Sequence, residues 1–121
     1  MRLEQDYYET MIARLNGLTG LFVVRLKNDC SVYQGHFPGE PVCPGVYNIQ
    51  LMRECAERVA RCNLRIQRIQ RCRFTALLTP TPDRELTVHI QLMPSDKGYV
   101  CQATLSDAQQ TYVEFKGELV Q

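Results

Sequence analysis

Hydrophobic and polar residues alternate along most of the chain, which is typical of strands with one buried face. The alternation is cleanest in the run LTVHIQL, residues 86–92. Asn16-Gly17 separates two further runs and predicts a hairpin turn, although residues 4–15 alone also fit a short helix. Together these patterns predict strands over 7–15, 18–26, 66–78, 86–92, 99–105 and 111–120.

Between Val46 and about Cys62 the spacing of the apolar residues changes to that of an α-helix. Apolar or small residues recur there at spacings of three and four, at Val46, Ile49, Met52, Ala56, Val59 and Ala60. Pro44 suits the first turn, and Asn63 is a stop signal. The polar side carries three pairs spaced i, i+4, which are Arg53–Glu57, Glu54–Arg58 and Glu57–Arg61.

These elements predict a single α+β domain over residues 1–121, with one helix inserted after two or three strands and three or four strands after it. The composition is that of an ordinary globular protein, with 45% hydrophobic and 22% charged residues. It excludes a disordered chain, a collagen-like fibre and a coiled coil. The chain has no internal repeat and no linker.

Cysteine usage and hydropathy point to a cytoplasmic protein. Six cysteines occur without any C-x-x-C pair, and the N-terminus lacks the apolar stretch of a signal peptide. We therefore interpret the cysteines as reduced, mostly buried thiols, and we expect neither a disulfide framework nor a metal site. No apolar run approaches the ~18–20 residues that span a bilayer, so we expect no membrane association.

The segment GHFPGEPVCPG carries the candidate chemistry. Six of the residues from 35 to 45 are Gly or Pro, so a shaped loop leads into the predicted helix. His36 can exchange protons near neutral pH, and the N–H groups of Gly45 and Val46 at the helix start can polarise a carbonyl. Such a site can remove a proton α to a carbonyl, but the residues alone favour an ordinary histidine in a Pro/Gly turn. The other histidine, His89, is interpreted as a sheet-face residue.

With Val46 added, this segment resembles the signature G-H-F-P-x-x-P-V-x-P-G-V of the hotdog-fold 3-hydroxyacyl-(acyl carrier protein) dehydratases. The resemblance extends from about residue 18 to 120 and includes the R-F step and the proline turn of RFTALLTPTPDREL. It implies a curved antiparallel sheet around one long helix, and a dimer with an active-site tunnel at its interface. It also implies no bound cofactor, because the substrate brings its own phosphopantetheine arm.

The resemblance assigns roles to individual residues. His36 would be the base that takes the C2 proton of a 3-hydroxyacyl thioester, and the backbone N–H of Gly45 would hold the thioester carbonyl. Phe37, Val46 and Tyr47 are further candidates for binding the substrate.

The sequence departs from the family pattern at the catalytic acid. The family places Glu or Asp five residues after the helix glycine, and this chain has Gln50 there. An amide can bond a hydroxyl or a water, but it cannot donate a proton as a carboxylic acid does. Glu54, one turn further on, is a tentative substitute acid, and it is also placed to pair with Arg58 on the helix surface.

The charge distribution suggests a partner. Seven arginines and two glutamates between residues 53 and 73 make this stretch +5, which leaves −4 for the rest of a chain whose net charge is +1. Acyl carrier proteins are acidic, so a basic patch of Arg61, Arg65 and Arg68 is a candidate carrier footprint. The alternative is that some of these arginines form i, i+4 ion pairs on the helix and that the others flank an exposed strand. Nucleic-acid binding has no supporting motif.

Three functions remain open at this point. The first is a dehydratase that converts a carrier-bound 3-hydroxyacyl chain to the 2-enoyl thioester in fatty-acid, lipid or polyene-type synthesis. The second is a thioesterase of the same fold, in which Gln50 positions a water. The third is a non-catalytic subunit that binds acyl chains or pairs with another hotdog protein as a heterodimer. A homodimer or higher homo-oligomer is the expected assembly for the first two.

Overall fold

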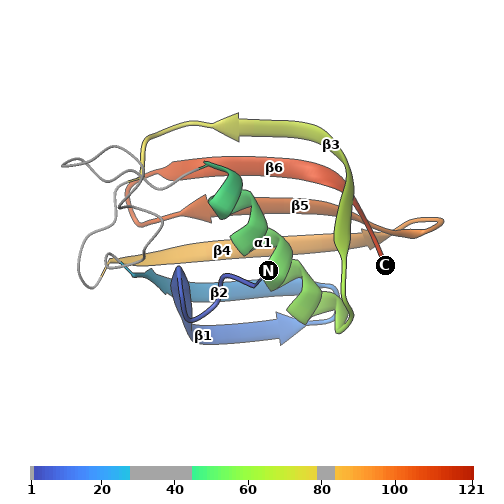
Figure 1. Cartoon of the computed structure of the whole chain (residues 1–121), viewed down its shortest axis with the longest axis horizontal. Coiled ribbons are helices and arrows are strands. Elements are labelled where there is room, and N and C mark those ends of the chain that lie inside the picture. Colours follow the sequence, from blue (N-terminus) through green and yellow to red (C-terminus); the bar gives the residue numbers. More distant parts are fainter. Residues whose placement is uncertain (1, 28–44, 79–83) are drawn as a thin grey trace.

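Six antiparallel strands and one helix form the described part of this computed structural model, which covers residues 2–27, 45–78 and 84–121. The elements are β1 (Tyr8–Asn16), β2 (Thr19–Leu26), α1 (Gly45–Ala60), β3 (Arg65–Phe74), β4 (Glu85–Pro94), β5 (Gly98–Ser106) and β6 (Thr111–Val120). The strands make one sheet in the order β1-β2-β4-β5-β6-β3, and α1 lies across one of its faces (Figure 1). This is the α+β hotdog fold that the sequence predicts.

The first hairpin turns at Asn16-Gly17, as predicted. Gly17 has a φ of 61°, in the left-handed region that glycine adopts without steric cost. Residues 8–16 pair with β2 in antiparallel register, with Tyr8 opposite Leu26. The alternative of a short helix over 4–15 is therefore wrong for most of that range.

The core lies between α1 and the inner face of the sheet. One cross-strand row consists of Phe22, Val88, Leu105 and Val113, each at most 1% exposed. The next row along the strands points to the opposite face, because successive strand residues alternate between faces. That row is largely polar and contains Leu21, His89, Thr104 and Glu114. The helix contributes Leu51, Met52, Cys55 and Ala56 to the core.

The helix begins one residue before its predicted start and ends two residues before Cys62, and all of its predicted apolar residues except Val46 are buried or half-buried. It stops at Ala60, before Asn63, and Arg61 takes a left-handed conformation with a φ of 60°. Val46, an apolar position of the predicted helix and a candidate substrate-binding residue, is 66% exposed on the first turn. Within the described residues, no helix is long and apolar enough to cross a membrane.

The cysteines that the structure describes are free thiols, as predicted. Cys55 and Cys101 are buried between the helix and the sheet, and Cys62 and Cys72 are half-buried. Burial raises the pKa of Cys101 to about 12, so this side chain stays protonated and packs as a small apolar group. The remaining two, Cys30 and Cys43, lie outside the described residues.

Asp107 fixes the turn between β5 and β6. Its Oδ1 accepts from the N–H groups of Gln109 at 2.8 Å and Gln110 at 3.0 Å. Its Oδ2 accepts from the Tyr112 hydroxyl and, at 3.1 Å, from Arg84. The Tyr112 hydrogen bond, together with the two backbone donors, lowers the pKa of Asp107 from 3.8 to about 2.

Asp107→Asn is therefore expected to cost stability at neutral pH and little in acid. A carboxyl with a depressed pKa stabilises the fold above its unfolded-state pKa, and this contribution disappears as the pH falls through the folded-state value. The difference in unfolding free energy between wild type and variant should shrink as the pH falls from 3.8 towards 2. Urea titrations at a series of pH values measure that difference. A difference independent of pH would contradict the assignment.

Candidate active site

The candidate active site begins at the first turn of α1. His36 and Phe37 lie outside the described residues, so the structure places neither of them. The chain is described again from Gly45, which is the first residue of α1. Gly45, Val46 and Tyr47, the other predicted substrate-binding residues, therefore stand together on one helix end, where the N–H groups lack intrahelical acceptors.

Gly45 is in close contact with the end of β3. A Cβ atom at this position would lie 2.7 Å from Cε1 of the Phe74 ring, so any larger residue would displace the ring. Phe74 is the last residue of β3 and is 55% exposed. The helix start, where the resemblance places the thioester carbonyl, is thus built against the terminal strand of the sheet.

The tyrosine next to the signature is held by the N-terminal strap, which we define as residues 2–8. The rings of Tyr47 and Tyr7 meet edge to face, with centroids 5.5 Å apart. The Tyr7 hydroxyl donates to Oδ1 of Asn48 at 2.7 Å, and both side chains are buried. Neither the helical spacing nor the signature assigns a role to Tyr7, although two adjacent tyrosines in a polar N-terminal stretch are a signal for a buried contact.

Gln50 occupies the position of the family's acid and is half-buried. Its Nε2 donates to Oε2 of Glu54 at 3.2 Å. A carboxylate can only accept, so this contact assigns the NH2 end of the amide to the side of Glu54. The amide oxygen of Gln50 is consequently the end turned away from Glu54.

Glu54 is 1% exposed and accepts hydrogen bonds from the N-terminal strap. Its donors there are the backbone N–H of Leu3 at 2.7 Å, the backbone N–H of Glu4 at 3.2 Å and the hydroxyl of Tyr8 at 2.9 Å. Burial raises the pKa of Tyr8, and the nearby Cys55 and Glu54 raise it further. The phenol therefore stays protonated and donates to the carboxylate.

The predicted surface pair between Glu54 and Arg58 is wrong, because Glu54 turns inward beneath the strap. Arg58 instead lies 4.0 Å from the carboxylate of Glu4 and 5.5 Å from the centroid of the Phe22 ring. This cation contributes to holding the strap against the helix.

Glu57 is also buried, at 8% exposed, rather than on the helix surface. Its carboxylate accepts from the backbone N–H of Leu64 at 2.8 Å, and it pairs with Arg53 at 3.0 Å and with Arg2 at 3.2 Å. The Arg53–Glu57 pair is therefore confirmed. The predicted Glu57–Arg61 pair is not formed in the described chain, because Arg61 has left the helix.

The carrier patch of Arg61, Arg65 and Arg68 lies at the far end of α1 from Gly45. All three arginines are exposed, and Arg68 is 3.9 Å from Glu118. The 16 residues of α1 separate the patch from the helix start by about 24 Å (Figure 1). Within one chain, the patch begins at the opposite end of α1 from the helix start.

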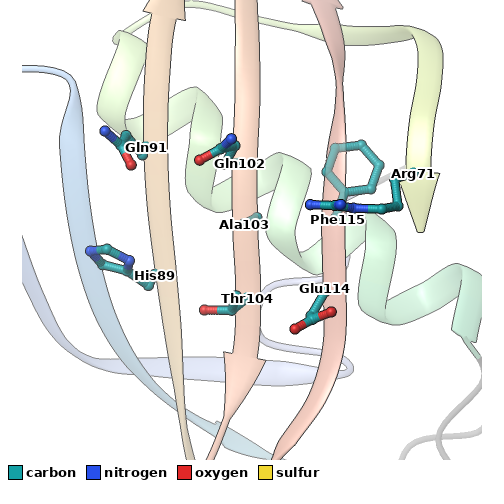
Figure 2. A pocket seen from close by; sticks show the side chains of 8 residues that line it. All are labelled: Arg71, His89, Gln91, Gln102, Ala103, Thr104, Glu114 and Phe115. Carbon is teal, nitrogen blue, oxygen red and sulfur yellow. The ribbon is translucent and has the colours of Figure 1, made fainter. Parts of the chain in front are cut away.

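The outer face of the sheet carries a separate polar groove. Figure 2 shows His89, Gln102 and Glu114 on neighbouring strands, with Arg71 reaching over from β3 and α1 behind the sheet. His89 is exposed there, which confirms its interpretation as a sheet-face residue. The whole sheet separates this histidine from the helix.

Comparison with known proteins identifies relatives of the chain. The model of the ApeI-like family, described as ApeI dehydratase, matches residues 16–116. The 3-hydroxyacyl-[acyl-carrier-protein] dehydratase FabZ of Lactiplantibacillus plantarum is 33% identical over an alignment of 85 residues, and the match covers 64% of this chain and 58% of that protein. The chain thus spans less than two thirds of the length of this curated relative.

Two solved structures share the fold. The dehydratase heterocomplex ApeI:P from Xenorhabdus doucetiae contains a chain that superposes with a TM-score of 0.79 and 19% identity, over 93% of this chain and 96% of that one. An uncharacterized protein from Erwinia carotovora subsp. atroseptica superposes with a TM-score of 0.70 and 16% identity, over 92% and 94%. Since the family model covers most of the 121 residues, the chain belongs to the ApeI-like dehydratase family.

Proposed function

We propose that the chain is a dehydratase that eliminates water from a 3-hydroxyacyl thioester carried on the phosphopantetheine arm of an acyl carrier protein. The observation that supports this most directly is the position of Gly45. The last glycine of the dehydratase signature is the first residue of α1, where a backbone N–H without an intrahelical acceptor can bind the thioester carbonyl.

The proposed reaction needs one base and one polarised carbonyl. His36 takes the proton from C2 while the N–H of Gly45 stabilises the negative charge on the thioester oxygen. The C2–C3 double bond then forms as the C3–O bond breaks. The leaving hydroxyl takes up the proton from His36 and departs as water, so the reaction needs no second acid.

Gln50 has an orienting role in this scheme. Because its NH2 end faces Glu54, its amide oxygen can accept a hydrogen bond from the substrate's 3-hydroxyl group. Glu54 is then a positioning residue, since its carboxylate is surrounded by donors and acts as their acceptor. The tentative assignment of Glu54 as the acid remains a testable alternative.

A second hotdog chain is part of the proposal. The carrier patch of Arg61, Arg65 and Arg68 is about 24 Å of helix away from Gly45 in the same chain. A partner related by an approximate two-fold axis would bring its own patch towards this site. An acidic carrier protein bound to one chain would then deliver its acyl chain to the other.

The proposed reaction can be distinguished from hydrolysis by its products. We expect the assembled protein to convert a 3-hydroxyacyl thioester to the 2-enoyl thioester, and to leave a saturated acyl thioester intact. Mass spectrometry of both reactions measures the products. Release of the free acid and the thiol from either substrate would identify a thioesterase instead.

Gln50 also supports a second candidate, a subunit without its own activity. Its amide cannot supply the proton that the family's carboxylic acid supplies. This candidate predicts no turnover by the pure chain and turnover after a second hotdog protein is added. Turnover by the pure chain would exclude it.

A further inference from the structure

Tyr7 contacts the described chain on both sides of residues 28–44. Its backbone carbonyl accepts from the N–H of Lys27 at 2.9 Å, and Lys27 directly follows β2. Its hydroxyl donates to Oδ1 of Asn48 at 2.7 Å, in the first turn of α1. One residue of the N-terminal strap therefore joins the end of β2 to the start of the helix.

These contacts are buried and leave Tyr7 little freedom. Tyr7 is 0% exposed and Asn48 is 3% exposed, so water cannot replace the hydroxyl bond unless the core opens. The Tyr7 ring also meets the Tyr47 ring edge to face. The backbone N–H of Tyr7 donates to the carbonyl of Leu3 at 2.8 Å, so the strap itself holds the residue in place.

The two groups of the proposed reaction belong to the segments that Tyr7 joins. Gly45 begins the helix that carries Asn48, and His36 lies nine residues after Lys27 and nine before Gly45. Holding the two ends of a chain segment at a fixed separation reduces the number of conformations open to it. The base and the carbonyl-binding N–H must act on one substrate, and a displacement of about 1 Å between such groups can lower a rate by about 100-fold.

We infer that Tyr7 is a positioning residue. By holding the start of α1 against the end of β2, it fixes the N–H of Gly45 relative to the segment that carries His36. The inference rests on the proposed function, in which His36 and Gly45 act on the same thioester. If Tyr7 only filled the core, loss of its hydroxyl would lower stability and leave turnover by the folded molecules unchanged.

The variant Tyr7→Phe removes the hydroxyl bond to Asn48 and keeps the ring and the backbone carbonyl. We expect kcat and kcat/KM for dehydration, both per folded molecule, to fall by a similar factor of about 10 to 100, because a displaced base affects the transition state and not the capture of substrate. Asn48→Ala removes the same bond from the helix side. The double variant should be about as slow as the slower single variant, since both changes break one interaction.

A second measurement needs no turnover. The chain has two histidines, so protein labelled with carbon-13 at the histidine Cε1 gives two NMR signals, and His89→Ala identifies the signal of His36. In folded Tyr7→Phe the His36 signal should shift, because the two ends of its segment are no longer held together in the same way. The signal of His89, on the face of the sheet opposite α1, should stay where it is in wild type (Figure 2).

Tyr112→Phe is the matched control. Tyr112 is also buried, at 2% exposed, and its hydroxyl donates to Asp107 in the turn between β5 and β6. This variant should lose stability, because a buried hydroxyl bond is removed. It should keep the wild-type turnover per folded molecule and the wild-type His36 signal.

The results that would overturn the inference are specific. They are an unmoved His36 signal in folded Tyr7→Phe, an equal shift in Tyr112→Phe, or wild-type turnover by folded Tyr7→Phe. If circular dichroism shows that Tyr7→Phe is unfolded, Asn48→Ala replaces it in both measurements. A wild type that folds but does not dehydrate a 3-hydroxyacyl thioester would contradict the proposed function alone, because the His36 signal still tests the role of Tyr7.

Discussion

Replacing His36 with alanine is expected to lower the rate of dehydration of a 3-hydroxyacyl thioester by about 100- to 10,000-fold. In the proposed reaction His36 is the base for C2 and also returns the proton to the leaving hydroxyl. The variant therefore loses proton transfer at both stages, and no other proposed group replaces it. The rate is measured in the hydration direction from the loss of enoyl absorbance, or directly from product formation.

The chain contains its own control for this experiment, because it has only two histidines. His89 lies exposed on β4, on the face of the sheet opposite α1 (Figure 2). His89→Ala should retain wild-type turnover, and both variants should keep the wild-type circular dichroism spectrum. Wild-type turnover in folded His36→Ala would contradict the proposed mechanism.

The sheet could be predicted from the sequence because each of its faces has a different environment. In β4 the residues Leu86, Val88 and Ile90 face the helix, and Thr87 and His89 face outward. A strand with one buried face requires this alternation, so the local sequence contains the information. The hairpin at Asn16-Gly17 was predictable for the same reason, since the left-handed turn is a local requirement.

The buried face of the helix could be predicted only in part. Glu54 and Glu57 belong to pairs at i, i+4, which normally indicate a solvated face. Both are buried because the N-terminal strap, some 50 residues earlier in the chain, lies over them. The helical spacing of apolar residues predicts which side of the helix is apolar. It does not predict that donors from a distant segment will bond to a carboxylate and allow its burial.

The residues of the candidate site were predicted from the resemblance to the dehydratase signature more than from hydrophobic spacing or composition. Gly45 and Gln50 were located by the signature, and the structure adds the Phe74 ring against Gly45 and the contact from Gln50 to Glu54. The basic stretch was identified from charge alone. Within that stretch, the carrier patch of Arg61, Arg65 and Arg68 lies towards the opposite end of α1 from Gly45, because the chain runs along the helix before β3 begins.

Glu54→Ala is expected to lower the free energy of unfolding by about 2–6 kcal/mol. The substitution leaves the buried N–H of Leu3 and the buried hydroxyl of Tyr8 without their acceptor. Each buried donor without a partner costs about 1–3 kcal/mol, which is the basis of this range. Urea unfolding followed by circular dichroism measures the change.

Two further variants identify what the carboxylate does. Glu118→Ala removes a half-buried β6 carboxylate that is 3.9 Å from the exposed Arg68, and it should change stability by less than about 1 kcal/mol. Glu54→Gln keeps the size of the side chain and one acceptor oxygen, so its loss of stability should lie between those of the two alanine variants. Glu54→Ala with wild-type stability would show that the strap is not anchored at Glu54.

Glu54→Gln also separates the anchoring role from the role of acid. If Glu54 donates the proton to the leaving hydroxyl, the amide should lower turnover by about 100-fold or more, even where the variant is fully folded. If Glu54 anchors the strap and orients Gln50, turnover per folded molecule should fall far less, because His36 still carries the proton. The geometry favours the second result, because the buried carboxylate of Glu54 is already engaged as acceptor by Leu3, Tyr8 and Gln50.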